Sequence, residues 1–185
     1  MILDSLVTDR LILRKWTEKD INPFVEMNQD TDVMKYFPKT LSQEETLSFV
    51  ERIITHFGKH HFGLFALEDK ASTEFIGFTG LMIPSFESDF TPCVEIGWRL
   101  RKEFWGKGIA TEAANACLKF GFETLNLDKI VSFTAKLNTR SEKVMQRLGM
   151  SCIKDFDHPK VDKDSMLCRH VLYELTKEQF ASSYL

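Results

Sequence analysis

Two glycines at alternate positions, Gly106 and Gly108, separate an apolar segment from an alanine-rich segment and indicate a site for an anion. The apolar segment, 93–100, is typical of a strand, and the alanine-rich residues up to about Leu125 are typical of a helix. Glycine lets a backbone turn tightly and approach a ligand without a Cβ in the way. A helix that begins at such a turn directs free N–H groups and the positive end of its dipole into that space. We therefore predict a phosphate cradle here, for a pyrophosphate in particular.

Three other interpretations compete with a pyrophosphate cradle at this segment: a mononucleotide loop, a dinucleotide fingerprint and a turn that serves only packing. The mononucleotide loop G-x-x-x-x-G-K-[ST] is absent, because Lys107 is followed by Gly108 rather than by Ser or Thr. The dinucleotide fingerprint G-x-G-x-x-G is met only in its first half, because Thr111 holds the third glycine position. Asp128 precedes the next apolar strand instead of ending it, which is the wrong place to hold a ribose. On this segment alone, a glycine turn that serves only strand-to-helix packing remains an alternative.

A carboxylate within the preceding strand, Glu95, is a candidate general base. Glu95 alternates with Val94, Ile96 and Trp98, so its side chain lies on the opposite face from three apolar residues. A carboxylate in mid-strand beside an apolar cleft has a raised pKa, so it can accept a proton directly or through water. A salt-bridged or surface glutamate is the alternative at this position.

Histidines and cysteines do not form a recognisable site. His56 and His60 lie four residues apart, but Gly58 interrupts the spacing and no H-E-x-x-H is present, so we predict no metal. The four cysteines lie far apart without the signature of a nucleophile, and we expect them to be buried free thiols. The 16 phenylalanines lack the basic interleaving of a base-stacking platform, and we assign them to the core.

Composition excludes several classes of partner. A net charge of −3 and a pI near 6.0 provide no electrostatic footprint for nucleic acid or an anionic membrane. No apolar run approaches the length of a membrane span, and Asp4 interrupts any signal peptide at the start. We therefore expect a cytoplasmic protein, a monomer or a homodimer, that binds neither nucleic acid nor membrane.

The pattern of apolar and capping residues predicts alternating strands and helices in a single domain spanning 1–185. Thr17 with Asp20, and Ser42 with Glu45, form capping boxes that begin two helices. The other expected elements are strands at 11–16, 62–67, 75–83, 93–100 and 129–137, two strands near Cys152 and Leu172, and helices ending near 125 and 148. This is an α/β (α+β) arrangement with a mixed sheet of about seven strands and about four helices.

Three segments in the right order resemble one known family. Trp105–Ala110 (W-G-K-G-I-A) resembles the Q/R-x-x-G-x-G/A signature of the GNAT superfamily of N-acetyltransferases, with Trp105 in place of Gln or Arg. Asn138–Ser141 followed by the helix that ends in L-G-M resembles its second motif, N-x-x-S with L-G-F/M. Thr8–Arg14 resembles the T-x-R-L-x-L-R opening of the ribosomal-protein-alanine acetyltransferase-like branch.

This resemblance implies a GNAT fold and a binding site for acetyl-coenzyme A. The fourth and fifth strands, at 93–100 and 129–137, are expected to be parallel and to splay apart so that the thioester enters between them. The pantetheine arm would then pair with the strand end, and Asn138 would hydrogen-bond it. The implied cofactor contacts are Trp98, Arg99, Leu100, Gly106, Lys107, Gly108, Ile109, Ala110, Thr111 and Asn138.

The implied reaction is acetyl transfer from acetyl-coenzyme A to a primary amine by direct attack, without a metal. The amine must lose a proton and the departing thiolate must gain one. Glu95 is the candidate for the first role, and Ser141, from the matching N-x-x-S, is the candidate for the second. The acceptor is left open between a protein N-terminus and a small-molecule amine. An acyl-coenzyme A-binding sensor with little turnover is the alternative from another class, and a Rossmann-type oxidoreductase is the third.

Overall fold

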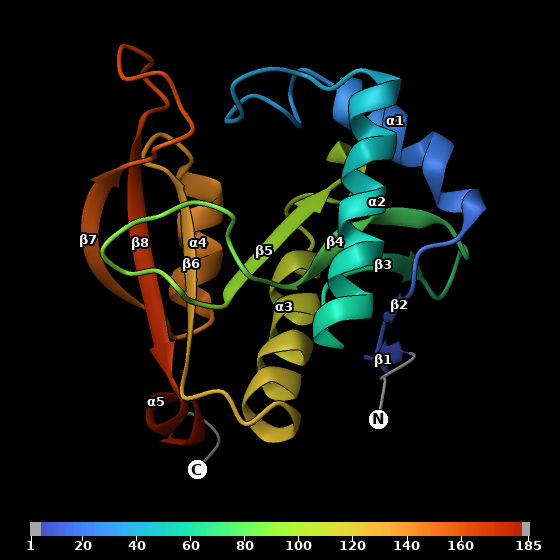
Figure 1. Ribbon diagram of the computed structural model, residues 1–185. Helices are drawn as coiled ribbons and strands as arrows, with labels where there is room; N and C mark the ends of the chain where they lie inside the picture. Colours follow the sequence, from blue (N-terminus) through green and yellow to red (C-terminus); the bar gives the residue numbers. More distant parts are fainter. Residues whose placement is uncertain (1–4, 183–185) are drawn as a thin grey trace.

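An eight-stranded mixed sheet runs through the centre of the computed structural model, which describes residues 5–182 (Figure 1). The strand order is β1-β2-β3-β4-β5-β6-β8-β7, and only the contact between β5 and β6 is parallel. The strands are β1 (Ser5–Val7), β2 (Leu11–Arg14), β3 (Leu64–Asp69), β4 (Phe75–Met82), β5 (Glu95–Leu100), β6 (Lys129–Ala135), β7 (Ser151–Asp157) and β8 (Arg169–Thr176).

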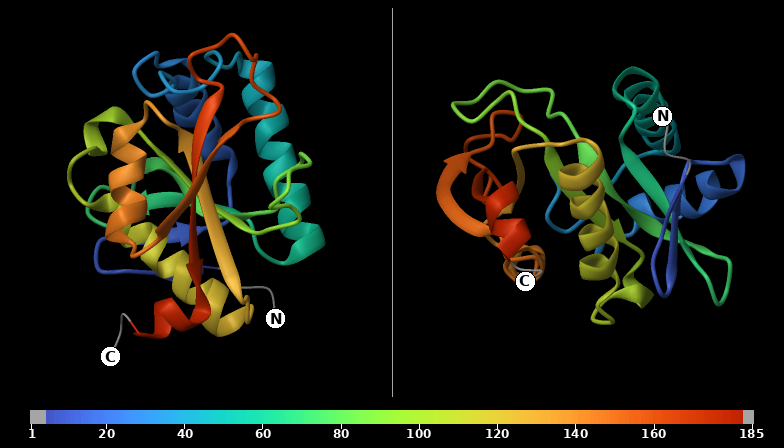
Figure 2. Two further views of the ribbon diagram at one scale, coloured as in Figure 1. Left: turned by 90° about the vertical axis from the view of Figure 1, so that its left-hand side faces the viewer. Right: turned by 90° about the horizontal axis from the view of Figure 1, so that it is seen from below.

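Helices cover both faces of this sheet (Figure 2). The helices α1 and α2 lie on one face, and α3 and α4 lie on the other. Their bounds are α1 (Ile21–Gln29), α2 (Gln43–His60), α3 (Ile109–Lys119), α4 (Thr139–Arg147) and α5 (Lys177–Ser182), with a π-helical turn (Phe120–Thr124) after α3 and 3-10 turns at Glu18–Asp20 and Lys102–Phe104. No helix within the described residues is long and apolar enough to cross a membrane.

The sequence predictions of the fold are confirmed in class and corrected in detail. The sheet has eight strands rather than seven, because the short strand β1, of three residues, pairs with β2. A fifth helix, α5, follows the last strand. Both elements are shorter than the window in which a hydrophobic period is readable. Met1–Asp4, where we predicted no signal peptide, lies outside the described residues.

The capping boxes begin helices where they were expected. The Ser42 hydroxyl accepts from the Glu45 N–H at 3.2 Å, and the Glu45 carboxylate accepts from the Ser42 N–H at 2.9 Å. Asp20 accepts from the Thr17 N–H at 2.8 Å at the start of the turn that leads into α1. The reciprocal bonds satisfy N–H groups that a helix start otherwise leaves without partners.

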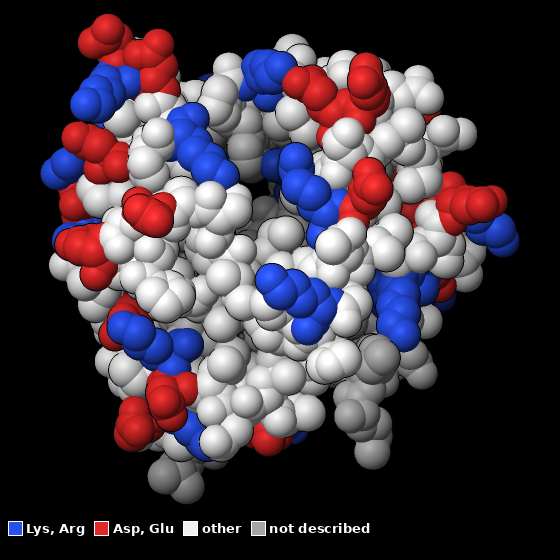
Figure 3. Space-filling view, viewed as in Figure 1, with Lys and Arg blue, Asp and Glu red and all other residues white. Residues whose placement is uncertain are grey.

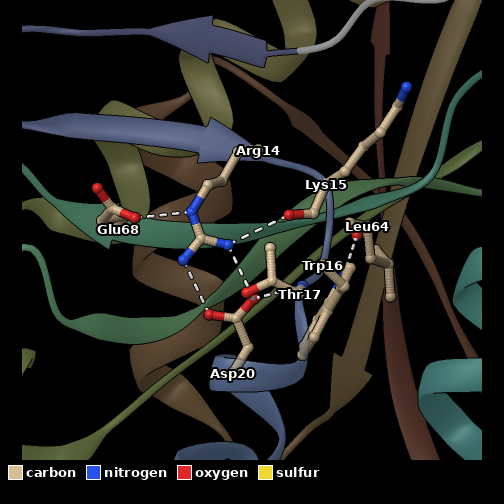
Figure 4. A network of polar contacts seen from close by, with 7 residues as sticks. All are labelled: Arg14, Lys15, Trp16, Thr17, Asp20, Leu64 and Glu68. Atoms are coloured by element: carbon tan, nitrogen blue, oxygen red, sulfur yellow. Dashed lines mark hydrogen bonds and ion pairs between the residues drawn. The ribbon is translucent and has the colours of Figure 1, made fainter.

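A buried ion pair fixes the N-terminal strands to α1 (Figure 4). Two nitrogens of Arg14 donate to the two oxygens of Asp20, each at 2.8 Å, and a third donates to Glu68 at 2.7 Å. Burial alone would raise the pKa of the Asp20 carboxyl, but its bonds to Arg14 and the Thr17 backbone hold that pKa below its ordinary value. The indole of Trp16 donates to the Leu64 carbonyl at 2.7 Å beside this pair.

The four cysteines are free thiols, but they are not all buried as expected. Cys117 and Cys168 are buried, Cys93 is partly buried and Cys152 is exposed. Cys152 lies on β7, the edge strand of the sheet, where the first three residues are all open to solvent.

Candidate active site

The two parallel strands β5 and β6 separate almost as soon as they meet. Their one register pair is Glu95 with Val131, supported by a 2.9 Å bond from the Val131 N–H to the Val94 carbonyl. Next, the Ser132 hydroxyl, rather than a backbone N–H, donates to the Ile96 carbonyl at 2.9 Å. No described strand pairs with β5 on this side beyond that point. The expected splay between the fourth and fifth predicted strands therefore begins at Glu95.

The separation leaves one edge of β5 open. Backbone groups of successive strand residues point to opposite edges, so Trp98 and Leu100 face the gap as Val94 does. The Leu100 carbonyl accepts from the indole of Trp105 at 3.0 Å. Arg99 is a correction to our expectation, because its carbonyl points to the other edge, where a Cβ placed on Gly77 of β4 would lie 2.2 Å from it. Arg99 therefore does not offer its backbone to a ligand in the gap.

The predicted cradle lies at the start of α3. Gly106 and Gly108 both have left-handed φ values, 73° and 77°, and α3 begins at the next residue, Ile109. Nothing lies within 4 Å of a Cβ placed on Gly106, so this turn borders open space that a side chain would fill. A cavity of about 560 Å³ lies over the turn, lined by Asp9, Gly106, Gly108, Thr111, Glu112, Asn115 and Arg147. The helix N-terminus and the glycine turn fit an anionic group.

The opening segment of the chain holds this cradle in place. Glu112, in the first turn of α3, accepts from the Thr8 hydroxyl at 2.6 Å and from the Arg10 Nε at 2.6 Å. The Arg10 Nη1 also donates to the Lys107 carbonyl at 2.9 Å. Burial alone would raise the pKa of the Glu112 carboxyl, but the bonds from Thr8 and Arg10 lower it. The T-x-R segment, which the sequence analysis identified only by its resemblance to the family, thus holds the glycine turn against the N-terminal strands through Thr8 and Arg10. We call these contacts the N-terminal clamp.

The basic residues near the cradle differ in what they contact. The Lys107 ammonium lies 5.3 Å from the centroid of the Phe104 ring, and Lys102 is paired with Asp32. The Arg140 guanidinium lies 4.9 Å from the ring centroid of Trp105, the residue that departs from the family signature. Sequence reasoning missed Arg140, because its contact with Trp105 depends on how α4 packs beside the turn.

Asn138 and Ser141 lie where β6 leads into α4. The Asn138 side chain caps α4, accepting from the Ser141 N–H at 3.3 Å, and donates to the Thr134 hydroxyl at 3.0 Å. The Ser141 hydroxyl oxygen accepts from the Trp98 indole N–H at 3.3 Å. The structure thus brings Trp98 and Ser141 together across the gap between β5 and β6.

Glu95 lies where β5 and β6 begin to separate, and its carboxylate has no partner in the part of the chain that the structure describes. Its side chain is only partly buried, and it forms no hydrogen bond or ion pair with any described residue. Burial raises the pKa of the Glu95 carboxyl to about 8. The Arg99 side chain shares this face of β5, but its guanidinium binds Asn28 on α1 instead. The alternative of a salt-bridged Glu95 is therefore not what the structure contains.

The face of the molecule that carries α2 and the loop before β5 is hollowed near its middle, with Lys and Arg side chains on both sides (Figure 3). The loop before β5 also contributes to an aromatic cluster, in which the rings of Phe86, Phe90, Phe133, Phe156 and His158 contact one another. Burial and the neighbouring His170 lower the pKa of His158 to about 4, so its imidazole is uncharged at neutral pH.

His56, weighed above as a metal ligand, has a structural role. Its Nδ1 contacts the Phe62 carbonyl at 2.8 Å and its Nε2 accepts from the Ile83 N–H at 3.1 Å. Both ring nitrogens are therefore engaged by the backbone. Among the described residues, no group of three or more His, Cys, Asp or Glu side chains is placed to hold a metal.

Comparisons with known proteins agree with this geometry. Residues 10–151 match the family model described as an acetyltransferase (GNAT) domain. The chain is 32% identical over 147 residues to the uncharacterized protein YkkB of Bacillus subtilis, covering 79% of this chain and 84% of that one. It is 29% identical to the uncharacterized N-acetyltransferase YnaD of the same organism, covering 78% and 81%.

A solved structure of a GNAT-family protein has the same fold. The acetyltransferase (GNAT family) from Bacillus anthracis superposes with a TM-score of 0.77 at 27% identity, covering 94% of this chain and 99% of that one. The family model alone spans well over half of the sequence. The chain therefore belongs to the GNAT family and is an acetyltransferase.

Proposed function

We propose that this enzyme transfers an acetyl group from acetyl-coenzyme A to a primary amine by direct attack within a ternary complex. The observation that carries the proposal is the separation of β5 from β6 beyond Glu95, with a glycine turn and a helix N-terminus close to the gap. The open strand edge suits an extended pantetheine arm, and the turn suits its pyrophosphate.

The cofactor residues we propose follow from these two features. The backbone of Trp98 and the N–H of Leu100 are available to the arm along the gap, and Asn138 stands across from it. The amides from Gly106 to Thr111, including those of Lys107, Ile109 and Ala110, are the proposed partners of the pyrophosphate. When bound there, acetyl-coenzyme A supplies an activated thioester. No step that we propose uses a metal.

Glu95 and Ser141 are the proposed acid–base pair. As the amine nitrogen bonds to the acetyl carbonyl carbon and the carbon–sulfur bond breaks, Glu95 accepts the proton of the amine. A pKa near 8 makes the Glu95 carboxylate a stronger base than an ordinary glutamate. The Ser141 oxygen accepts from Trp98, which leaves the hydroxyl proton free to be donated to the departing thiolate.

The acceptor belongs to the same proposal. A relative that is 24% identical over 155 residues is spermidine N(1)-acetyltransferase of Escherichia coli, which favours an amine acceptor for this chain as well. A protein N-terminus or a small-molecule amine remains the proposed acceptor class. The expectations of a cytoplasmic location and of a monomer or homodimer stay predictions.

A thermal-shift panel with acetyl-coenzyme A, NAD and ATP tests the proposal. Acetyl-coenzyme A alone should raise the melting temperature, because a ligand at 100 times its Kd stabilises the folded state by about 2.7 kcal/mol. Amines are then screened for release of free thiol. Stabilisation without thiol release from any amine would favour the acyl-coenzyme A sensor. Stabilisation by NAD instead would favour an oxidoreductase and would contradict the proposal.

A further inference from the structure

The Arg99 guanidinium is a largely buried cation, and no carboxylate among residues 5–182 pairs with it. Its Nη1 donates to the Asn28 side-chain oxygen at 2.6 Å, which is the one hydrogen bond that the guanidinium forms with the described residues. Its Nε is buried and has no partner in that part of the chain. Arg14, by contrast, is paired with two carboxylates, Asp20 and Glu68.

Neutral groups hold this guanidinium in place. Asn28 is fully buried and donates in turn to the Thr46 hydroxyl on α2 at 3.3 Å. The guanidinium carbon lies 4.0 Å from the ring centroid of Phe37 and 5.4 Å from that of Phe78. Stacking on rings stabilises a cation by about 0.5–2 kcal/mol, which is less than the cost of taking an unpaired charge out of water. Accordingly, burial lowers the pKa of Arg99 to about 9.

The location of Arg99 points to the acceptor rather than to the cofactor. Residues 95, 97 and 99 share one face of β5, whereas Trp98, which contacts Ser141, lies on the other. Asn28 belongs to α1 and Phe37 to the segment between α1 and α2, so the Arg99 side chain faces the side of the sheet that these helices cover. Glu95 and Arg99 are four residues apart on this strand, so their Cα atoms are separated by roughly 13 Å.

We propose that Arg99 binds a carboxylate on the acceptor, and that the acceptor is an amine whose carboxylate lies several bonds away. Among the described residues no acceptor binds the Nη2 or the buried Nε of Arg99, so the edge of the guanidinium that matches a carboxylate with two parallel hydrogen bonds is left without a partner. Because the two side chains start roughly 13 Å apart on the strand and the Arg99 guanidinium is held by Asn28, an acceptor that reaches both residues must carry its carboxylate several bonds from its amine. This inference rests on the proposed function, because it takes the Glu95 side of the gap as the acceptor side.

Paired acceptors test the inference by activity. With acetyl-coenzyme A saturating, kcat/KM is compared for 6-aminohexanoate and 6-aminohexanamide, which differ only in the anionic group, and for glycine and glycinamide. The wild type should prefer the long acid over its amide by about 10- to 100-fold, the range of hydrogen bonds to charged groups, and should not prefer glycine. Equal values for the long pair would overturn the proposal.

Variants assign that preference to one residue. In Arg99→Gln, kcat/KM should fall by about 10- to 100-fold more with the acid than with the amide, so that the preference for the acid is lost, and Arg99→Lys should keep part of that preference. Arg52→Gln is the matched control, because Arg52 is an exposed arginine whose guanidinium lies 5.3 Å from the neighbouring Phe49 ring. Preserved acid preference in a folded Arg99→Gln, checked by circular dichroism, would overturn the proposal. So would a loss of acetyl-coenzyme A affinity in that variant alone, because it would assign Arg99 to the cofactor.

A binding measurement keeps the test independent of turnover and of the variants. Calorimetric titration of the wild type with hexanoate, and with hexanamide as the control, should show binding of the acid only. If acetyl-coenzyme A fails to stabilise the protein, the proposed function fails, and hexanoate binding still reports on Arg99. If the cofactor binds and hexanoate does not, the inference about Arg99 fails and the proposed function stands.

Discussion

The indole N–H of Trp98 on β5 donates a hydrogen bond to the Ser141 hydroxyl on α4 at 3.3 Å, across the gap where β5 and β6 separate. The bond connects a residue of the predicted cofactor strand to the residue predicted to protonate the thiolate. It also uses an acceptor lone pair of Ser141 and leaves the hydroxyl proton available.

Replacing Ser141 with Ala should lower kcat by about 10²-fold, the lower end of general-acid contributions, with little change in the Kd of acetyl-coenzyme A. Trp98→Phe keeps an aromatic ring but removes the donor, so its effect on kcat should be smaller. The double variant should be no slower than Ser141→Ala, since the indole acts through the hydroxyl. Additive losses in steady-state kinetics would show that Trp98 and Ser141 act separately.

Replacing Gly108 with Val should abolish detectable binding of acetyl-coenzyme A in calorimetry. The substitution adds a side chain at the turn and forces a left-handed φ on a β-branched residue, which costs about 1–2 kcal/mol of stability. Gly149→Val is the control for that strain, because Gly149 has nearly the same φ, 76°, and does not line the cavity. Both variants should melt earlier than the wild type. Unchanged affinity in Gly108→Val would show that the cradle is elsewhere.

Replacing Glu112 with Gln should weaken acetyl-coenzyme A binding by about 3- to 10-fold, because the charged hydrogen bonds that hold the glycine turn through Arg10 are lost. Glu123→Gln, which alters an exposed pair with Lys119 at 4.0 Å beyond the other end of α3, should leave the Kd unchanged. Equal Kd values for the two variants would refute the role of the N-terminal clamp.

Local chemistry explains which parts of the fold could be predicted. Ser42 with Glu45 is a complete start signal within four residues, period-two alternation marks β5, and a continuous apolar run marks β4. The short β1 carries no such signal and forms because β2 offers it an edge. Cys152 was misassigned as buried because its exposure depends on β7 being the outermost strand, which is a property of topology and not of local pattern.

The same difference between local signals and contacts set by topology applies to the residues of the site. Glu95 could be placed on its face of β5 from its immediate neighbours alone. The Arg10–Glu112 pair joins residues 102 positions apart, and the Arg99–Asn28 bond joins residues 71 apart. Such contacts follow from packing between distant elements. The resemblance placed Arg99 among the cofactor residues through its backbone, and the contact of its side chain with α1 could not be predicted from the sequence.

The buried pair of Asp20 with Arg14 should dominate acid sensitivity. Asp20→Asn should reduce the free energy of unfolding at pH 7 by about 3 kcal/mol, because it leaves Arg14 without its main partner. The folded-state pKa of Asp20 is lowered, so the stabilisation is complete above the ordinary value of 3.8 and is lost as pH falls through the folded-state value. Denaturant titrations should therefore show the variant and wild type converging below about pH 4. Asp32→Asn, at an exposed pair with Lys102, is the control and should change little.

The raised pKa of Glu95 predicts the opposite pH dependence of stability. Between the ordinary value of 4.5 and about 8, the folded protein keeps a proton that the unfolded chain has lost, so stability falls as pH rises. Glu95→Gln removes this effect. The variant should match the wild type near pH 4.5 and melt at a higher temperature at pH 8.5. An identical difference in melting temperature at both pH values would show that the carboxyl is not perturbed.

The most direct test of the mechanism is the pH profile of kcat/KM for the wild type and Glu95→Gln, measured with two acceptors that differ in amine pKa. A limb due to the amine moves with the acceptor, whereas a limb due to Glu95 stays near pH 8 with both. We predict that the wild type shows this fixed limb. We predict that Glu95→Gln lacks the limb and is slower by about 10²–10⁴-fold, the usual worth of general-base catalysis. A variant that keeps the fixed limb and stays within about tenfold of the wild type would contradict the assignment of Glu95 as the base.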